Sequence, residues 1–171
     1  MIGTALSHLA VWRDLAASAY PAFLILEDDV TLCPGFEGQL VEICGELTRE
    51  HPAFDAVLLG YFDWRPQSQD DFATGFRPAQ LRPFDGSRFL GGTFAYIISR
   101  RGAEKLIAIA GRDGIQNGID RFVHRKAAEL EILVSSPKIA EAQLVVPGSG
   151  ADSDIQNDFT PLSAAGPAQG H

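Results

Sequence analysis

Phe23-Leu24-Ile25-Leu26-Glu27-Asp28-Asp29, at residues 23–29, is the stretch of sequence that decides the fold. Four consecutive apolar side chains, bounded by Pro21 on one side and three carboxylates on the other, predict a strand buried on both faces of a mainly parallel sheet. The carboxylates then lie at the carboxyl end of this strand, which is the edge at which α/β proteins bind ligands.

Helical and strand patterns alternate after this stretch, and a helical pattern precedes it. Helices are predicted over residues 4–19, 36–49, 101–110 and 118–129, and strands over residues 56–60, 91–99, 132–134 and, at an edge, 144–146. This alternation predicts an α/β layer fold. Residues 63–85 are rich in Pro, Gln, Asp and Gly and are too many for an ordinary connection, so we expect an active-site loop on the acceptor side.

The size and composition predict one domain. A chain of 171 residues with 46% hydrophobic content can bury a single core, which we place within residues 1–159. Residues 160–171 are mostly Ala, Gly, Pro and Ser and are expected to form a disordered tail. Cys33 and Cys44 are too few for a disulfide scaffold and are expected to be reduced thiols.

The net charge and the hydropathy pattern limit which binding partners and which cellular location are expected for this chain. The formal net charge of −8 would repel a phosphate backbone, so we expect no nucleic-acid partner. The first residues carry no positive cluster before an apolar stretch, and Arg13 and Asp14 interrupt them, so neither a signal peptide nor a transmembrane segment is predicted. The expected location is cytoplasmic, with peripheral association at the inner face of the membrane as an alternative.

The three adjacent acids Glu27, Asp28 and Asp29 indicate a cation site. Like charges after a buried strand repel one another and are costly to desolvate unless a cation neutralises them. A hard divalent ion with oxygen ligands suits this set, with Asp29 as the first ligand and Glu27 or Asp28 beside it. The alternative is that these acids cap a helix or face solvent.

Four motifs carry a family resemblance when they are taken in order. They are GTALSHLAVW (3–12), LILEDDV (24–30), GGTFAYIISRRGAEKL (91–106) and GIDRFV (118–123). The order resembles glycosyltransferase family 25, the lipooligosaccharide-biosynthesis and collagen-galactosyltransferase family. The positions that match the family pattern are Gly3, Ser7, His8, Trp12, Glu27, Asp28, Asp29, Gly92, Thr93, Tyr96, Ser99 and Asp120.

The resemblance implies a three-layer GT-A-type fold and an enzyme of the hexosyltransferase class. It implies transfer of a hexose, often galactose, from a UDP-sugar to a lipooligosaccharide or another glycan or glycolipid acceptor, with inversion at the anomeric centre. The residues expected to contact the donor are Ser7, His8, Glu27, Asp28 and Thr93. Manganese or magnesium is expected to be bound by Asp29, Glu27 and Asp28. The family has a further strand before the Ser-His helix, so an N-terminally shortened domain is expected.

Catalytic roles follow from the chemistry of such a transfer. A cation offsets charge on the departing diphosphate, and a carboxylate within hydrogen-bond reach of the acceptor hydroxyl takes its proton. Asp29, through the metal, and Asp120, as the base or beside a metal ligand, are the expected catalytic residues. Asp120 can equally be a first-turn acid of the following helix, and a lone helix histidine such as His8 is often structural.

Several aromatic and basic residues admit two interpretations. Trp12 and Tyr96 are expected to pack in the core, whereas Tyr61 and Trp64 are better placed to stack on a sugar. Three basic side chains follow the predicted strand at 91–99, namely Arg100, Arg101 and Lys105. They could bind a diphosphate, but exposed basic side chains at the start of a helix are common. Two other functions stay open, namely a degenerate, non-catalytic sugar-nucleotide or glycan-binding module, and a hydrolase that uses the same acids and a cation.

Overall fold

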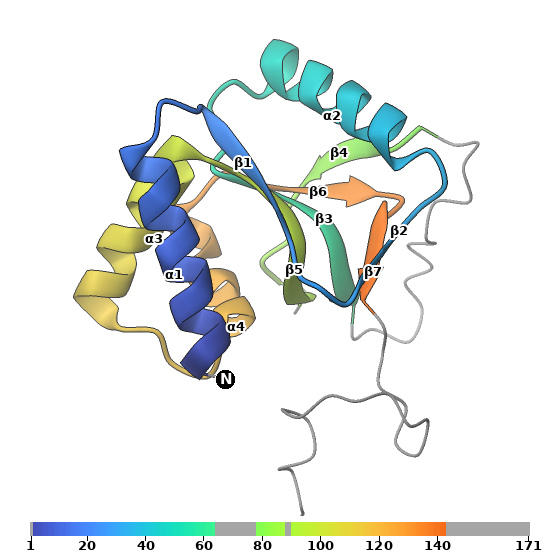
Figure 1. Cartoon of the computed structure of the whole chain (residues 1–171). Coiled ribbons are helices and arrows are strands. Elements are labelled where there is room, and N and C mark those ends of the chain that lie inside the picture. The colour runs from blue at the N-terminus through green and yellow to red at the C-terminus, as the bar shows by residue number, and fades with distance from the viewer. Residues whose placement is uncertain (1, 64–77, 88–89, 143–171) are drawn as a thin grey trace, which may run out of the picture.

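The computed structural model describes residues 2–63, 78–87 and 90–142 (Figure 1). In chain order the elements are α1 (Ile2–Ala17), β1 (Ala22–Leu26), β2 (Val30–Leu32), α2 (Phe36–Glu50), β3 (Ala56–Asp63), β4 (Gln80–Pro83), β5 (Leu90–Ser99), α3 (Arg100–Asp113), α4 (Ile119–Arg125), a 3₁₀ turn (Ala127–Glu129), β6 (Ile132–Ser136) and β7 (Ala140–Ala142). The predicted strand at 144–146, the tail at 160–171 and most of the loop at 63–85 lie outside the described residues.

The described elements form three layers. A five-stranded sheet of order β1-β5-β3-β6-β4 lies in the middle, with α2 on one face and α1, α3 and α4 on the other (Figure 1). Side chains alternate along β3, so Val57 and Leu59 pack toward α2 while Ala56 and Leu58 pack toward the other three helices. The predicted α/β class and the three layers are therefore confirmed.

The prediction of a mainly parallel sheet is wrong. β5 pairs antiparallel with both β1 and β3, and β4 pairs antiparallel with β6, whereas β3 and β6 are the parallel pair within the described sheet. β1 is an edge strand, and Leu24 and Leu26 are 39% and 40% exposed, so burial on both faces is also wrong. An unbroken apolar run marks a strand that packs under a helix, but it does not specify strand direction.

A buried ion network fastens α3 to the start of β3. The Asp55 carboxylate is fully buried and accepts hydrogen bonds from Arg101 Nε at 2.8 Å, Lys105 Nζ at 2.6 Å and the Glu131 N–H at 2.8 Å. Gly102 lies against the same segment, because a Cβ atom built there would be 2.1 Å from the Asp55 carbonyl oxygen. Arg101 and Lys105 thus have a structural role.

Two further expectations concern cysteines and membrane spans. Cys33 is buried and Cys44 is exposed, and both are free, as expected. None of the helices in the described ranges has the length and apolar content that crossing a bilayer requires.

Candidate functional site

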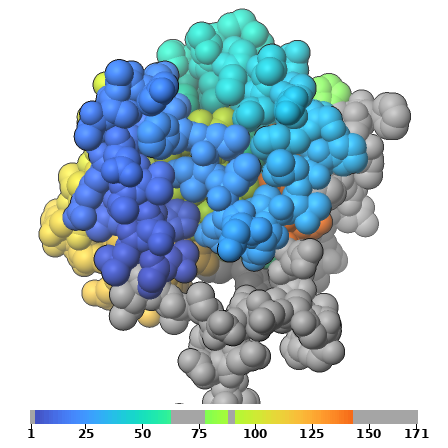
Figure 2. Space-filling model, in the orientation of Figure 1, coloured from blue at the N-terminus to red at the C-terminus, as the bar shows by residue number. Residues whose placement is uncertain are grey.

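The acidic turn, which we define as Glu27, Asp28 and Asp29, follows β1 directly. The Glu27 N–H donates to the Phe94 carbonyl at 2.7 Å and so extends the pairing of β1 with β5 by one residue. Asp28 and Asp29 then reverse the chain into β2 and are exposed. In Figure 2, α1, the β1–β2 segment and α2 (blue to cyan) form most of the face shown, and the turn belongs to this part of the surface.

Negative charge accumulates in the turn. The pKa of Asp29 is raised, first by partial burial and then by the charges of Glu27 and Asp28, of which Glu27 acts more strongly. A cation at this position would relieve the repulsion and favour the ionised form of Asp29.

The donor chemistry of the turn fits a hard divalent cation, because carboxylate oxygens are the ligands that Mg²⁺ and Mn²⁺ prefer. The three carboxylates do not converge into a cage. Among the described residues, the trio of His, Cys, Asp or Glu whose ligand atoms all lie within 4.8 Å of one another is Glu46, Glu50 and His51, at the end of α2. The turn therefore offers part of a coordination sphere, which suits an ion that keeps water or phosphate ligands.

His8 joins three of the four motifs. It is 4% exposed on α1, and its Nε2 lies 3.1 Å from Glu27 Oε1 while its Nδ1 lies 2.7 Å from the Tyr96 hydroxyl. The Trp12 Nε1–H donates to the same hydroxyl at 2.9 Å, and burial raises the pKa of Tyr96. Trp12 and Tyr96 pack in the core as predicted, and both ring nitrogens of His8 are engaged by protein side chains.

The other predicted site residues are Thr93, Ser7 and Asp120, and they differ in burial and in hydrogen-bond partners. Thr93 is buried on β5, next to the residue whose carbonyl binds the Glu27 N–H. Ser7 is exposed and donates to the Gly3 carbonyl within α1 at 3.1 Å. Asp120 is half-buried in the first turn of α4, where Oδ1 accepts from the Arg121 N–H at 2.7 Å. The structure thus brings His8 into contact with Glu27 and places Thr93 one residue from the strand partner of Glu27, whereas Ser7 and Asp120 each bond a backbone group of their own helix.

Two aromatic predictions have different outcomes. Tyr61 is 1% exposed, and its hydroxyl donates to the Ser135 carbonyl at 3.2 Å, so a role in stacking on a sugar is wrong. Trp64 lies outside the described residues. Sequence reasoning placed Tyr96 in the core but missed its hydrogen bond to His8, because the two residues are 88 positions apart and no local pattern links them.

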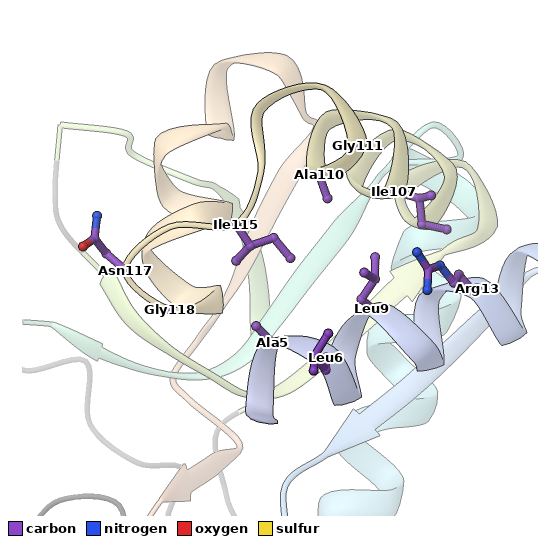
Figure 3. Close-up of a pocket in the computed structure, with 10 residues that line it drawn as sticks. All are labelled: Ala5, Leu6, Leu9, Arg13, Ile107, Ala110, Gly111, Ile115, Asn117 and Gly118. Carbon is purple, nitrogen blue, oxygen red and sulfur yellow. The ribbon is translucent and has the colours of Figure 1, made fainter. Parts of the chain in front are cut away.

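A separate pocket of about 580 Å³ lies between α1 and α3 (Figure 3). Its lining is mainly apolar, with Leu6 and Leu9 from α1 and Ile107 from α3, and Arg13 is the charged residue among the side chains that line it. None of the predicted catalytic, donor or metal residues lines this pocket. It is therefore distinct from the acidic turn.

The fold and the acidic turn together define an α/β domain with a carboxylate-rich turn directly after the edge strand β1. The model of the family described as "Glycosyltransferase family 25 (LPS biosynthesis protein)" matches residues 1–120, which include the first three motifs and reach Asp120 in the fourth. The chain belongs to glycosyltransferase family 25.

Relatives from a virus and from animals are similar to this chain. "Putative glycosyltransferase R655" of Acanthamoeba polyphaga mimivirus is 28% identical over 170 residues, covering 95% of this chain and 50% of that protein. "Inactive glycosyltransferase 25 family member 3" of Homo sapiens is 28% identical over 107 residues, covering 63% of this chain and 17% of that protein. The chain therefore spans half or less of the length of these relatives.

Proposed function

We propose that this chain is a metal-assisted glycosyltransferase that moves a hexose, galactose in the first instance, from a UDP-sugar to a lipooligosaccharide or another surface glycan, with inversion. Family membership supports transfer of a sugar. The observation that carries the proposal is the contact between buried His8 and Glu27, because it joins separate family motifs at one charged turn. The proposal includes the GT-A assignment of the three-layer fold.

The roles within the site follow from the chemistry of the turn. Asp29, with Glu27 or Asp28, would hold Mn²⁺ or Mg²⁺, which offsets the charge of a departing diphosphate when bound. Thr93 and Ser7 would contact the donor. Asp120 would accept the proton of the acceptor hydroxyl, and its helix packs against β5 and α1, the elements that carry Tyr96 and His8.

The proposed setting is the cytoplasm, at the inner face of a membrane that carries the glycolipid acceptor. The net charge of −8 disfavours general adsorption to an anionic surface, so recognition would depend on the glycan rather than on headgroup charge. Residues 63–85 would provide acceptor contacts.

The test is calorimetric titration of UDP-galactose and UDP-glucose into the protein, with and without MnCl₂, on the wild type, Asp29→Ala and Asp14→Ala. Asp14 is an exposed acid of α1 and serves as the matched control. We expect metal-dependent binding in the wild type and in Asp14→Ala, and its loss in Asp29→Ala. Binding of neither nucleotide to the folded protein under either metal condition would reject the proposal.

A second candidate is a non-catalytic sugar-nucleotide or glycan-binding module. It is favoured by the similarity to a human family member whose name states that it is inactive. Release of UDP over time separates the two functions. Binding without release, in the presence of Mn²⁺ and a lipooligosaccharide acceptor, would favour the module.

A further inference from the structure

Four side chains form an unbroken hydrogen-bonded series from the core to the acidic turn. In order they are Trp12, Tyr96, His8 and Glu27, and we refer to them as the Trp12–Glu27 network. The successive heavy-atom distances are 2.9, 2.7 and 3.1 Å. Trp12, Tyr96 and His8 are 0%, 3% and 4% exposed, so water does not replace these contacts.

The donors and acceptors of the network fix its direction. The indole Nε1–H of Trp12 can only donate, so the Tyr96 oxygen accepts from it. The single hydroxyl proton of Tyr96 is then available to His8 Nδ1, which must be unprotonated to accept it. The remaining proton of a neutral imidazole is on Nε2, where it donates to the Glu27 carboxylate.

The other tautomer of His8, with the proton on Nδ1, leaves buried polar groups without hydrogen-bond partners. A proton on His8 Nδ1 would point at the Tyr96 oxygen, and the Tyr96 hydroxyl proton would then lose its acceptor within the network. The unprotonated Nε2 would then face a carboxylate oxygen, and two lone pairs would oppose each other at 3.1 Å. Of the two neutral tautomers, the Nε2–H form is the one that satisfies every member of the network.

We propose that His8 is a positioning residue for Glu27. The core holds the imidazole in its Nε2–H form, the imidazole holds Glu27 Oε1, and Oε2 is left for a ligand of the acidic turn. The Glu27 side chain is 33% exposed, which is compatible with one oxygen held inside and one available to a cation. A carboxylate that is oriented in this way binds a metal without first losing side-chain freedom. The role in ligand binding rests on the proposed function, whereas the tautomer does not.

The tautomer is tested by nuclear magnetic resonance of the ¹⁵N-labelled protein at neutral pH. The chain has four histidines, and loss of signals in His8→Gln assigns the His8 ring. We expect an unprotonated Nδ1, a protonated Nε2 and an Nε2–H proton signal that shifts or disappears in Glu27→Ala. An Nδ1–H form, an even mixture of the two forms, or an Nε2–H signal unchanged in Glu27→Ala would overturn the inference, and none of these outcomes depends on donor binding.

The positioning role is tested by comparing His8→Gln with His8→Asn. The amide nitrogen of Gln is as many bonds from Cβ as Nε2 and can still donate to Glu27, whereas the amide of Asn reaches only to the position of Nδ1. We expect His8→Asn to weaken Mn²⁺-dependent UDP-sugar binding about 10–100-fold, as is usual when a partner of a metal ligand is removed, and His8→Gln to stay close to the wild type.

Thermal unfolding of both variants checks that they are folded to the same extent. Equal losses of affinity, or no loss in either variant, would show that His8 only packs in the core. If the wild type binds no UDP-sugar, the proposed function fails and the resonance experiment alone decides the state of His8.

Discussion

The acidic residues of this chain lie in two opposite electrostatic environments. Burial alone would raise the pKa of Asp55, but hydrogen bonds from Lys105, the Glu131 N–H and Arg101 outweigh it and lower that pKa. The pKa of Asp29 is instead raised, first by burial and then by neighbouring acids. Cationic side chains of the protein therefore compensate the charge of Asp55, whereas the raised pKa of Asp29 agrees with the proposed role of the acidic turn as a cation site.

Asp55→Asn is expected to destabilise the fold and to change its response to acid. Removing the charge weakens hydrogen bonds to two cations, for a cost of about 1.5–3 kcal/mol in the free energy of unfolding at neutral pH. Because the folded-state pKa is lowered, the contribution of Asp55 is complete above the ordinary value of 3.8 and is lost as the pH falls through the folded-state value.

Urea unfolding at several pH values measures this effect, with Asp14→Asn as the exposed control. The difference between wild type and Asp55→Asn should shrink as the solution is acidified. A difference that stays constant down to the lowest pH would contradict the role assigned to the ionised carboxylate.

Tyr96→Phe is expected to lower stability although the ring is retained. The substitution leaves the buried Trp12 Nε1–H without its acceptor and His8 Nδ1 without its donor, and each unsatisfied group costs about 1–3 kcal/mol. Chemical denaturation compares it with Tyr20→Phe, where the side chain is 66% exposed and no change is expected. Equal midpoints for the two variants would argue against the Trp12–Glu27 network.

The acidic residues of the turn and of the core were predictable from sequence to different degrees. Glu27, Asp28 and Asp29 stand out because they are adjacent and follow an apolar run. Asp55 lies between Phe54 and Ala56 without any distinguishing pattern, and its partners are 46 to 76 positions away. Long-range hydrogen bonds of this kind depend on how the elements pack, and no local period encodes them.

At the scale of elements, length decided what could be predicted. Five of the predicted elements are present at slightly shifted bounds, because each is long enough for its apolar pattern to show. They are the helices at 4–19, 36–49 and 101–110 and the strands at 56–60 and 91–99. β2, β4 and β7 have three or four residues each and were missed. Strand direction was predicted wrongly because β5 reaches both neighbours in antiparallel register, and pairing of that kind is set by connections rather than by composition.

The packing of α3 on β3 gives a matched pair of substitutions on one helix. In Gly102→Ala the new Cβ would meet the Asp55 backbone at 2.1 Å, whereas at Gly111 it would meet nothing within 4 Å. We expect Gly102→Ala to destabilise the domain by about 1–3 kcal/mol through overpacking. Gly111→Ala should stabilise it by about 0.5–1 kcal/mol through helix propensity.

Thermal and urea unfolding of the two variants provide the measurement. If Gly102→Ala unfolds like the wild type, α3 is not seated against the Asp55 backbone.

At the scale of the whole molecule, the net charge of −8 complicates any metal experiment, because cations also gather on an acidic surface without a specific site. Because the pKa of Asp29 is raised, the folded state favours the protonated carboxyl. The stability that this protonated form provides is lost as the pH rises from the ordinary value of 3.8 through the folded-state pKa. Asp29→Asn should therefore stabilise the metal-free protein slightly, by a few tenths of a kcal/mol after solvent screening.

Added Mn²⁺ should make the wild type more stable than Asp29→Asn, because a ligand that binds only the folded state raises the unfolding temperature. The expected rise occurs in the wild type and not in Asp29→Asn, at a salt concentration that screens diffuse binding. His51→Gln removes one potential ligand from Glu46, Glu50 and His51 at the end of α2 and should keep the response. A response lost in His51→Gln and kept in Asp29→Asn would assign the cation to α2 instead.

β5 makes two separate backbone contacts that matter for this domain. Near the middle of the strand the Phe94 carbonyl accepts from the Glu27 N–H, and at its carboxyl end the Ser99 N–H donates to the Asp55 carbonyl at 3.0 Å. These contacts are five residues apart along an extended strand, or about 16 Å. Substitutions at the acidic turn can therefore remove the proposed chemistry while the contact at Ser99 preserves the architecture, so a family member could lose activity and still fold.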